Sequence, residues 1–69
     1  MNKITKLIKA KQAEKGFSRR KLSDLTGYEE NYLSTLIHGK TGFPYSFLVC
    51  ISDVLDIDLS TLIKLKNEK

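Results

Sequence analysis

Three consecutive cationic side chains, Arg19, Arg20 and Lys21, have the residue types and spacing that most clearly point to chemistry. They follow Ser18, a favoured N-cap residue, and so fall in the first turn of a predicted helix. The helix dipole already presents positive charge there, so each cation is unfavourable by about 0.3–1 kcal/mol at low salt. The cluster is typical of a site where an anion such as phosphate docks on backbone N–H groups and arginine. The alternative is that the three cations bind nothing and only destabilise this helix slightly, an effect too small to have been selected against.

Catalytic and metal-binding residue types are scarce. His38 is the single histidine and Cys50 the single cysteine. A nucleophile–base pair would need these two side chains to be adjacent, but Cys50 stands within an apolar helical run that is typical of a packed cysteine. A zinc site needs three or four ligands at close spacing, which the sequence lacks. We therefore expect no enzyme activity, no metal, no cofactor and no small-molecule ligand.

The charge is distributed unevenly along a short chain. The chain has 69 residues, a length that predicts a single domain over residues 1–69. Its net charge is +4. Residues 1–21 hold eight basic and one acidic side chain, whereas residues 22–63 hold one basic and six acidic ones. A basic amino-terminal third indicates a polyanionic partner. A lysine-rich helix face that is merely solvated remains the alternative.

The cysteine content and the apolar runs bear on the compartment. One cysteine cannot form a disulfide within the chain, which fits a reducing cytosol. The longest apolar run has five residues, too few to span a bilayer, and the lysine-rich start lacks a signal-peptide pattern. We therefore expect a cytoplasmic protein without a membrane segment.

Hydrophobic periodicity and capping residues predict an all-α fold of five helices. The helices are expected at about Asn2–Lys15, from Ser18 to Gly27, at Glu30–His38, at Pro44–Leu55, and from Asp58 into the lysine-rich end. Asn2, Ser18 and Asp58 are the expected N-caps. The expected apolar faces consist of Ile4, Leu7, Ile8 and the Lys11 stem; Leu22 and Leu25; Leu33, Leu36 and Ile37; Phe47, Leu48, Ile51, Val54 and Leu55; and Leu59, Leu62 and Ile63.

The second and third helices have the spacing of a helix-turn-helix over about residues 19–38. Ser23 lies four residues before Gly27, and Leu33 and Leu36 lie six and nine residues after it. Such a motif needs a small residue where the helices cross, a glycine at positive φ in the turn, and apolar residues that lock the second helix. An ordinary antiparallel helix pair with a glycine turn has the same features, so the spacing alone leaves both open.

Residues 16–63 resemble the XRE helix-turn-helix DNA-binding family, which includes the Cro and lambda/434 repressor-type proteins. The resemblance rests on the joint order of several short segments: 16–22 (GFSRRKL), 26–27 (TG), 32–36 (YLSTL), 39–40 (GK), Pro44, 54–57 (VLDI), Leu59 and 62–63 (LI). It implies a compact, lambda-repressor-like five-helix bundle. It also implies a sequence-specific transcriptional regulator, expected to be a repressor, whose helix at Glu30–His38 enters the major groove of double-stranded DNA.

The resemblance also indicates which residues contact DNA. Arg19 matches a position that touches the sugar-phosphate backbone, and Glu30 and Asn31 match the two leading base-reading positions. Asn31 can bond N6 and N7 of adenine, and Glu30 can accept from N4 of cytosine. Ser34 and Thr35 match the next exposed turn of that helix. The helix end and the loop that usually meet phosphate are matched by His38, Lys40 and Thr41. The expected DNA-binding set is Arg19, Arg20, Glu30, Asn31, Ser34, Thr35, His38, Lys40 and Thr41.

A single module of this size buries too little surface for tight specific binding. We therefore expect a homodimer that reads a palindromic site, with half-sites about one helical turn apart. The family often uses its carboxy-terminal segment for this contact, and Leu65 extends the stripe of Leu62. The expected dimer contact is Leu59, Leu62 and Leu65.

The sequence departs from the family pattern at two places. Glu29 stands where Ser or Thr often caps the recognition helix, and Glu30 follows it. Two carboxylates favour an isolated helix N-terminus but are poor neighbours for phosphates. Ile37 and Gln12 stand where many relatives carry an acidic residue and its basic partner, which indicates that an ion pair has been replaced.

A second function class therefore stays open: the same fold used as a protein-interaction module without specific DNA binding. Glu29 and Glu30 would meet the partner, together with exposed aromatic residues. The candidates are Tyr28, Phe43 and Tyr45, of which at least one is expected at the edge of the core. The low charge of the recognition helix favours this reading, and the arginine cluster favours DNA.

Overall fold

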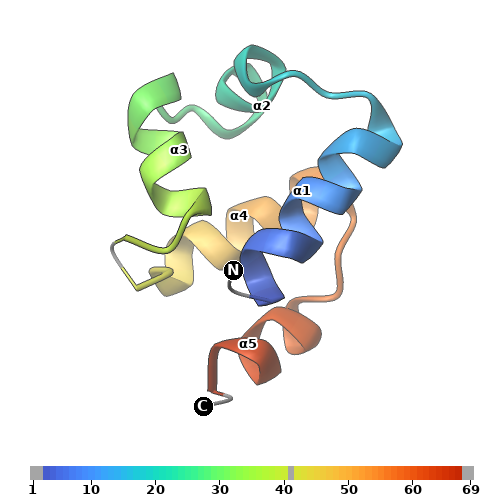
Figure 1. Ribbon diagram of the computed structural model, residues 1–69, viewed down its shortest axis with the longest axis vertical. Helices are drawn as coiled ribbons and strands as arrows, with labels where there is room; N and C mark the ends of the chain where they lie inside the picture. The colour runs from blue at the N-terminus through green and yellow to red at the C-terminus, as the bar shows by residue number, and fades with distance from the viewer. Residues whose placement is uncertain (1–2, 41, 68–69) are drawn as a thin grey trace.

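The computed structural model describes residues 3–40 and 42–67, and this part of the chain consists of five α-helices without a strand (Figure 1). The helices are α1 (Lys3–Lys15), α2 (Arg19–Thr26), α3 (Glu30–Ile37), α4 (Tyr45–Leu55) and α5 (Leu59–Asn67). The all-α, five-helix prediction is confirmed. Asn2, the expected cap of the first helix, lies outside the described residues.

Local capping sets the ends of α2 as the sequence predicts. The Ser18 Oγ accepts a hydrogen bond of 3.0 Å from the Lys21 N–H. Gly27 has a φ of +80° and donates from its N–H to the carbonyl of Ser23 at 2.8 Å. A left-handed conformation at this position favours glycine because it has no Cβ. The chain can therefore leave α2 sharply and begin α3 three residues later.

The boundaries of α3, α4 and α5 refine the predictions. His38 is the C-cap of α3 rather than a helical residue. Pro44 is the N-cap of α4, not its first residue, because its ψ of 144° is extended. Asp58 caps α5 as expected, since its Oδ1 accepts from the backbone N–H and the Oγ of Ser60 at 3.0 and 2.8 Å.

Gly39 ends α3, and both its backbone conformation and its contact with a neighbouring ring favour glycine at this position. Gly39 has a φ of +76°, and the N–H groups of Gly39 and Lys40 donate to the carbonyls of Leu36 and Thr35. These two bonds form the Schellman arrangement, which satisfies carbonyls that a helix end leaves unpaired. A Cβ on Gly39 would also lie 2.6 Å from the ring of Phe43. The loop after α3 therefore packs directly against the core.

The hydrophobic core draws on all five helices and on two connecting segments. Most expected core positions are buried, but Leu25 is 45 % exposed on the outer side of α2, so its assignment to an apolar face is wrong. Leu7, Val54 and Leu59 are only partly buried against the core. The buried hydrophobic residues are Ile4, Ile8, Leu22, Leu33, Leu36, Ile37, Phe43, Phe47, Leu48, Ile51, Leu55, Ile57 and Leu62.

Among the residues that the structure describes, one polar side chain is buried with them, and sequence reasoning missed it. Thr5 is 1 % exposed, and its Oγ1 donates a 2.7 Å hydrogen bond to the carbonyl of Ile37. Ile37 is the last residue of α3, where a helix leaves carbonyls without intrahelical partners. Thr5 therefore ties the end of α3 to α1.

The helices are arranged so that α1 and α4 support the helix-turn-helix. In Figure 1, α2 and α3 lie at one end of the molecule, α5 lies at the other, and α4 runs behind α1. Helix α1 packs against α3, α4 and α5, and α4 packs against α2. This packing fixes α3 relative to the start of α2. Within residues 3–40 and 42–67, no helix is long and apolar enough to cross a membrane.

Candidate nucleic-acid interface

The first turn of α2 presents its cations to solvent. Arg19, Arg20 and Lys21 are all exposed, and the Ser18 cap uses one of the backbone N–H groups of this turn. The expected position of the cationic cluster at a helix N-terminus is therefore confirmed. Helix dipole and side-chain charge have the same sign here, which creates a local positive potential that favours an anion.

The first turn of α3 is capped by its own acidic residue. The carboxylate oxygens of Glu29 accept from the N–H groups of Asn31 and Tyr32 at 3.0 and 3.3 Å. Glu29 is thus the N-cap of α3. Its charge is engaged by the helix N-terminus, which leaves Glu30 as the carboxylate on this turn that is available to other groups.

The exposed face of α3 carries the expected base-reading residues. Asn31 is exposed, whereas Glu30, Ser34 and Thr35 are half-buried. The Oγ1 of Thr35 donates to the carbonyl of Asn31 at 3.1 Å, one turn earlier in the helix. Because this hydroxyl is directed to the backbone, the methyl group of Thr35 is the part suited to an apolar contact.

An ion pair joins the starts of the two helices. The Nε of Arg19 lies 4.0 Å from the Oε1 of Glu30, and the two side chains are 57 % and 47 % exposed. An exposed pair at this distance contributes about 0–1 kcal/mol and is screened by salt. The sequence places these residues eleven positions apart, so only the helix-turn-helix geometry brings them together.

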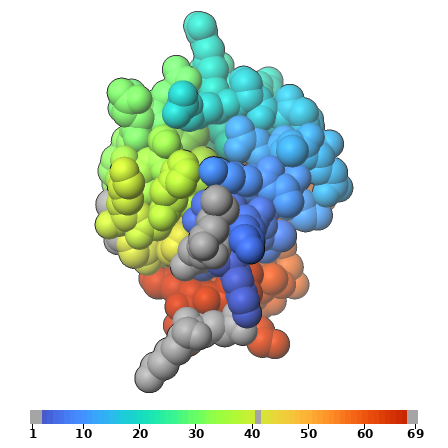
Figure 2. Space-filling model, viewed as in Figure 1, coloured from blue at the N-terminus to red at the C-terminus, as the bar shows by residue number. Residues whose placement is uncertain are grey.

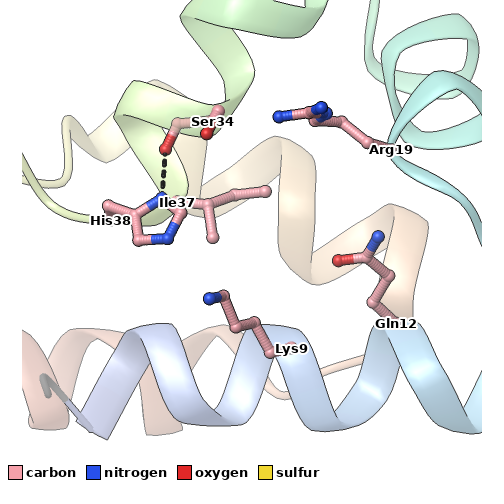
Figure 3. A pocket seen from close by; sticks show the side chains of 6 residues that line it. All are labelled: Lys9, Gln12, Arg19, Ser34, Ile37 and His38. Atoms are coloured by element: carbon pink, nitrogen blue, oxygen red, sulfur yellow. Dashed lines mark hydrogen bonds between the residues drawn. The ribbon is translucent and has the colours of Figure 1, made fainter.

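A hollow of about 200 Å³ opens between α1, the start of α2 and the end of α3. Figure 3 shows Lys9 and Gln12 reaching into it from α1, Arg19 from α2, and Ser34 and His38 from the α3 side. The Nδ1 of His38 lies 2.8 Å from the carbonyl of Ser34. Because a carbonyl oxygen can only accept, Nδ1 is the donor in this hydrogen bond, and Nε2 takes no part in it.

The hollow adds two residues that sequence reasoning did not assign to the site. From the sequence, Lys9 is only a member of the basic amino-terminal third, and Gln12 is only the first-helix side of a replaced ion pair. Figure 2 shows α1, α2 and α3 sharing one face of the molecule. This shared face brings a lysine, an arginine and an amide donor to one hollow, a combination suited to an anionic group.

The remaining expected site residues are dispersed. Lys40 is exposed in the loop after α3, and Thr41 lies outside the described residues. On α5, at the far end of Figure 1, Leu59 and Leu65 are partly buried. Leu62 is 0 % exposed, so it is a core residue and has no surface with which to contact a partner. The expected dimer contact is thereby reduced to Leu59 and Leu65, and it stays a prediction.

The aromatic residues divide between core and surface. Phe43 is buried, and Tyr28 packs at the edge of the core with its ring centroid 6.1 Å from that of Phe47. The expectation that at least one of these aromatics belongs to the core edge is confirmed. Tyr32 and Tyr45 are 48 % and 58 % exposed. The exposed surface therefore retains two tyrosines, one of them on α3.

Cysteine and metal-ligand residues form no chemical constellation in the part of the chain that is described. Cys50 is half-buried on α4, and its Sγ lies 3.9 Å from the carbonyl of Thr26. Burial, and to a lesser degree the charge of Asp53, raises the pKa of this thiol. Among residues 3–40 and 42–67, no three His, Cys, Asp or Glu side chains are grouped so that they could hold a metal ion.

Comparison with protein families gives one match that covers nearly the whole chain. Residues 3–68 match the Cro/C1-type HTH DNA-binding domain. Comparisons with curated proteins and with solved structures give no match. The matched span includes the helix-turn-helix, the hollow and α5.

Proposed function

Because this chain belongs to the Cro/C1-type helix-turn-helix DNA-binding family, we propose that it is a transcriptional repressor that recognises specific sequences in double-stranded DNA. One observation carries the proposal: the exposed first turn of α3 stands beside the cationic first turn of α2, and the Arg19–Glu30 pair joins them. One face thus combines groups that bind phosphate with groups that read bases. This combination is what a helix-turn-helix needs when its second helix enters the major groove.

Sequence choice is proposed to come from the exposed face of α3. Asn31, at the leading end, is suited to a bidentate contact with adenine, and the methyl group of Thr35 to a thymine methyl. Glu30 can accept from N4 of cytosine, and Ser34 can serve as donor or acceptor. Each good base contact of this kind contributes about 1–3 kcal/mol of discrimination against a wrong base.

Affinity is proposed to come from contacts with the phosphate backbone. Arg19 and Arg20 at the start of α2, together with His38 and Lys40 at the end of α3, flank the reading face on both sides. Thr41 is proposed as a further contact from sequence alone. These contacts carry little sequence information, but they fix the register of the domain and make binding depend steeply on salt.

A homodimer on a palindromic site is proposed because one such domain buries too little surface for tight specific binding. Leu59 and Leu65 remain the proposed contact, since both are apolar and only partly buried on α5. Action in the cytoplasm is part of the proposal. It rests on the single, half-buried cysteine, which suits a reducing compartment.

The deciding experiment selects bound duplexes from a random DNA pool at about physiological ionic strength, where non-specific binding is weak. A palindromic site is the expected result, and it would support both the specificity and the dimer. Recovery of nothing above background would overturn the proposal and favour use of the fold as a protein-interaction module.

Two variants then test the division of roles on the selected site. Asn31→Ala should weaken binding by about 1–3 kcal/mol on the selected site and relax the preference at one or two base pairs. Arg19→Gln should weaken binding both to the selected site and to unrelated sequences, because it removes a phosphate contact. Equal behaviour of the two variants on every sequence would show that the assigned roles are wrong.

A further inference from the structure

We propose that Glu30 lowers non-specific DNA binding by acting through Arg19, as an internal competitor of the DNA phosphate. The inference rests on the proposed DNA-binding function and adds a mechanism for its specificity. In the free protein the carboxylate of Glu30 faces the guanidinium of Arg19, with Oε1 and Nε 4.0 Å apart. A phosphate that pairs with Arg19 must share this guanidinium with the carboxylate or displace it.

The geometry provides a place for both anions. Arg19 pairs with Glu30 on one side, while the same side chain lines the hollow that also receives Lys9 and Gln12 (Figure 3). A guanidinium has five N–H donors in a planar fork, so it can turn from one set of acceptor oxygens to another without leaving its position. The incoming phosphate oxygen therefore binds in the hollow, and Glu30 loses its ion pair with Arg19.

The effect differs between a specific and a non-specific site. When Glu30 meets a suitable base edge, its carboxylate accepts a new hydrogen bond and Arg19 is released to the phosphate. On other sequences no base donates a hydrogen bond to Glu30. Its carboxylate then either stays paired with Arg19 or lies unpaired near the phosphates. Glu29 cannot take this role, because both of its oxygens cap the backbone of α3. Glu30 thus weakens binding to unrelated DNA sequences more than binding to the specific site.

The expected size follows from the exposure of the pair. An ion pair between half-exposed groups contributes at most about 1 kcal/mol, which corresponds to about a fivefold change in affinity. Glu30→Gln should therefore tighten binding to a duplex of unrelated sequence by about two- to fivefold at low salt. Because Arg19 is then fully available to phosphate, the slope of log affinity against log salt should steepen, by at most about one unit.

The test is a double-mutant cycle on non-specific duplex DNA with the full chain, using Glu30→Gln, Arg19→Gln and the double variant. Glu14→Gln is the matched control, because Glu14 is also half of an exposed ion pair, with Lys11 at 3.7 Å on α1, and the change adds the same charge. Far-UV circular dichroism of each variant checks that the fold is unchanged. Affinity is measured by fluorescence anisotropy over a series of salt concentrations.

Support requires that Glu30→Gln tightens non-specific binding more than Glu14→Gln does, and that most of this excess vanishes in the Arg19→Gln background. If Glu30→Gln has the same effect with and without Arg19, Glu30 acts directly on the phosphates and the inference is overturned. It is also overturned if Glu30→Gln weakens binding or equals Glu14→Gln. If the wild-type chain binds no DNA at any salt concentration, the proposed function fails, and this inference fails with it.

Discussion

The buried hydroxyl of Thr5 gives the sharpest prediction about stability. Thr5 is 1 % exposed, and its 2.7 Å hydrogen bond to the carbonyl of Ile37 joins residues that are 32 positions apart. Thr5→Val keeps the shape of the side chain and replaces the hydroxyl with a methyl group. The last carbonyl of α3 then loses its donor in an environment that water does not reach easily. Leaving a buried acceptor unpaired costs about 1–3 kcal/mol.

Urea unfolding followed by far-UV circular dichroism measures this cost. We expect the midpoint to fall without a change in the m-value, since the unfolded surface is the same. In a thermal scan, a domain of this size should lose about 4–8 °C for each kcal/mol. Thr5→Ser is the matched control: it keeps the donor and removes one methyl group, which costs about 0.8 kcal/mol.

The outcome of the comparison tests the reasoning directly. Thr5→Val should be less stable than Thr5→Ser if the hydrogen bond matters more than the methyl group. A Thr5→Val variant with wild-type stability would refute the argument, because the hydroxyl would then contribute nothing to the junction of α1 and α3. A Thr5→Ser variant that is the less stable of the two would show that packing, not the hydrogen bond, holds the junction.

Two further predictions concern the loop after α3 and the single cysteine. Gly39→Ala should destabilise the fold by about 1–3 kcal/mol more than Gly27→Ala, as measured by urea unfolding. Both glycines have a positive φ, but of the two only Gly39 would place the new Cβ against a side chain, the ring of Phe43. Equal costs would mean that the ring moves aside freely. Because burial raises the pKa of the Cys50 thiol, less thiolate is present at pH 8 than in a free cysteine, so iodoacetamide should react more slowly with the folded chain than with the urea-unfolded one. A folded rate as fast as the unfolded rate would contradict the assigned shift.

Features that depend on neighbouring residues in the chain could be predicted from the sequence. The Ser18 cap, the left-handed turn at Gly27 and the Asp58 cap all appear where the sequence places them. Each is decided within a few residues, because a capping side chain bonds to a backbone N–H two or three positions away. The five helices and the family follow from the same local signals in sequence order.

Features that depend on how helices pack could not be predicted in this way. Leu25 has the spacing of an apolar face, yet it is exposed, and Leu22 is the one residue of α2 that is buried in the core. Leu62 is expected both on an apolar face and in the dimer contact, yet it is fully buried and has no surface left for a partner. Burial is set by the rotation of each helix about its axis, and periodicity in a short helix leaves that rotation loosely defined.

The sequence by itself thus determined the helices, their caps, the helix-turn-helix spacing and the cationic start of α2, since each is a local property of the chain. Only the tertiary structure decided that Arg19 faces Glu30, that α1 contributes Lys9 and Gln12 to a hollow beside them, and that Thr5 closes the end of α3. These contacts join residues on different helices. Their distances depend on the crossing of packed helices, which is fixed by the whole core together rather than by any one segment.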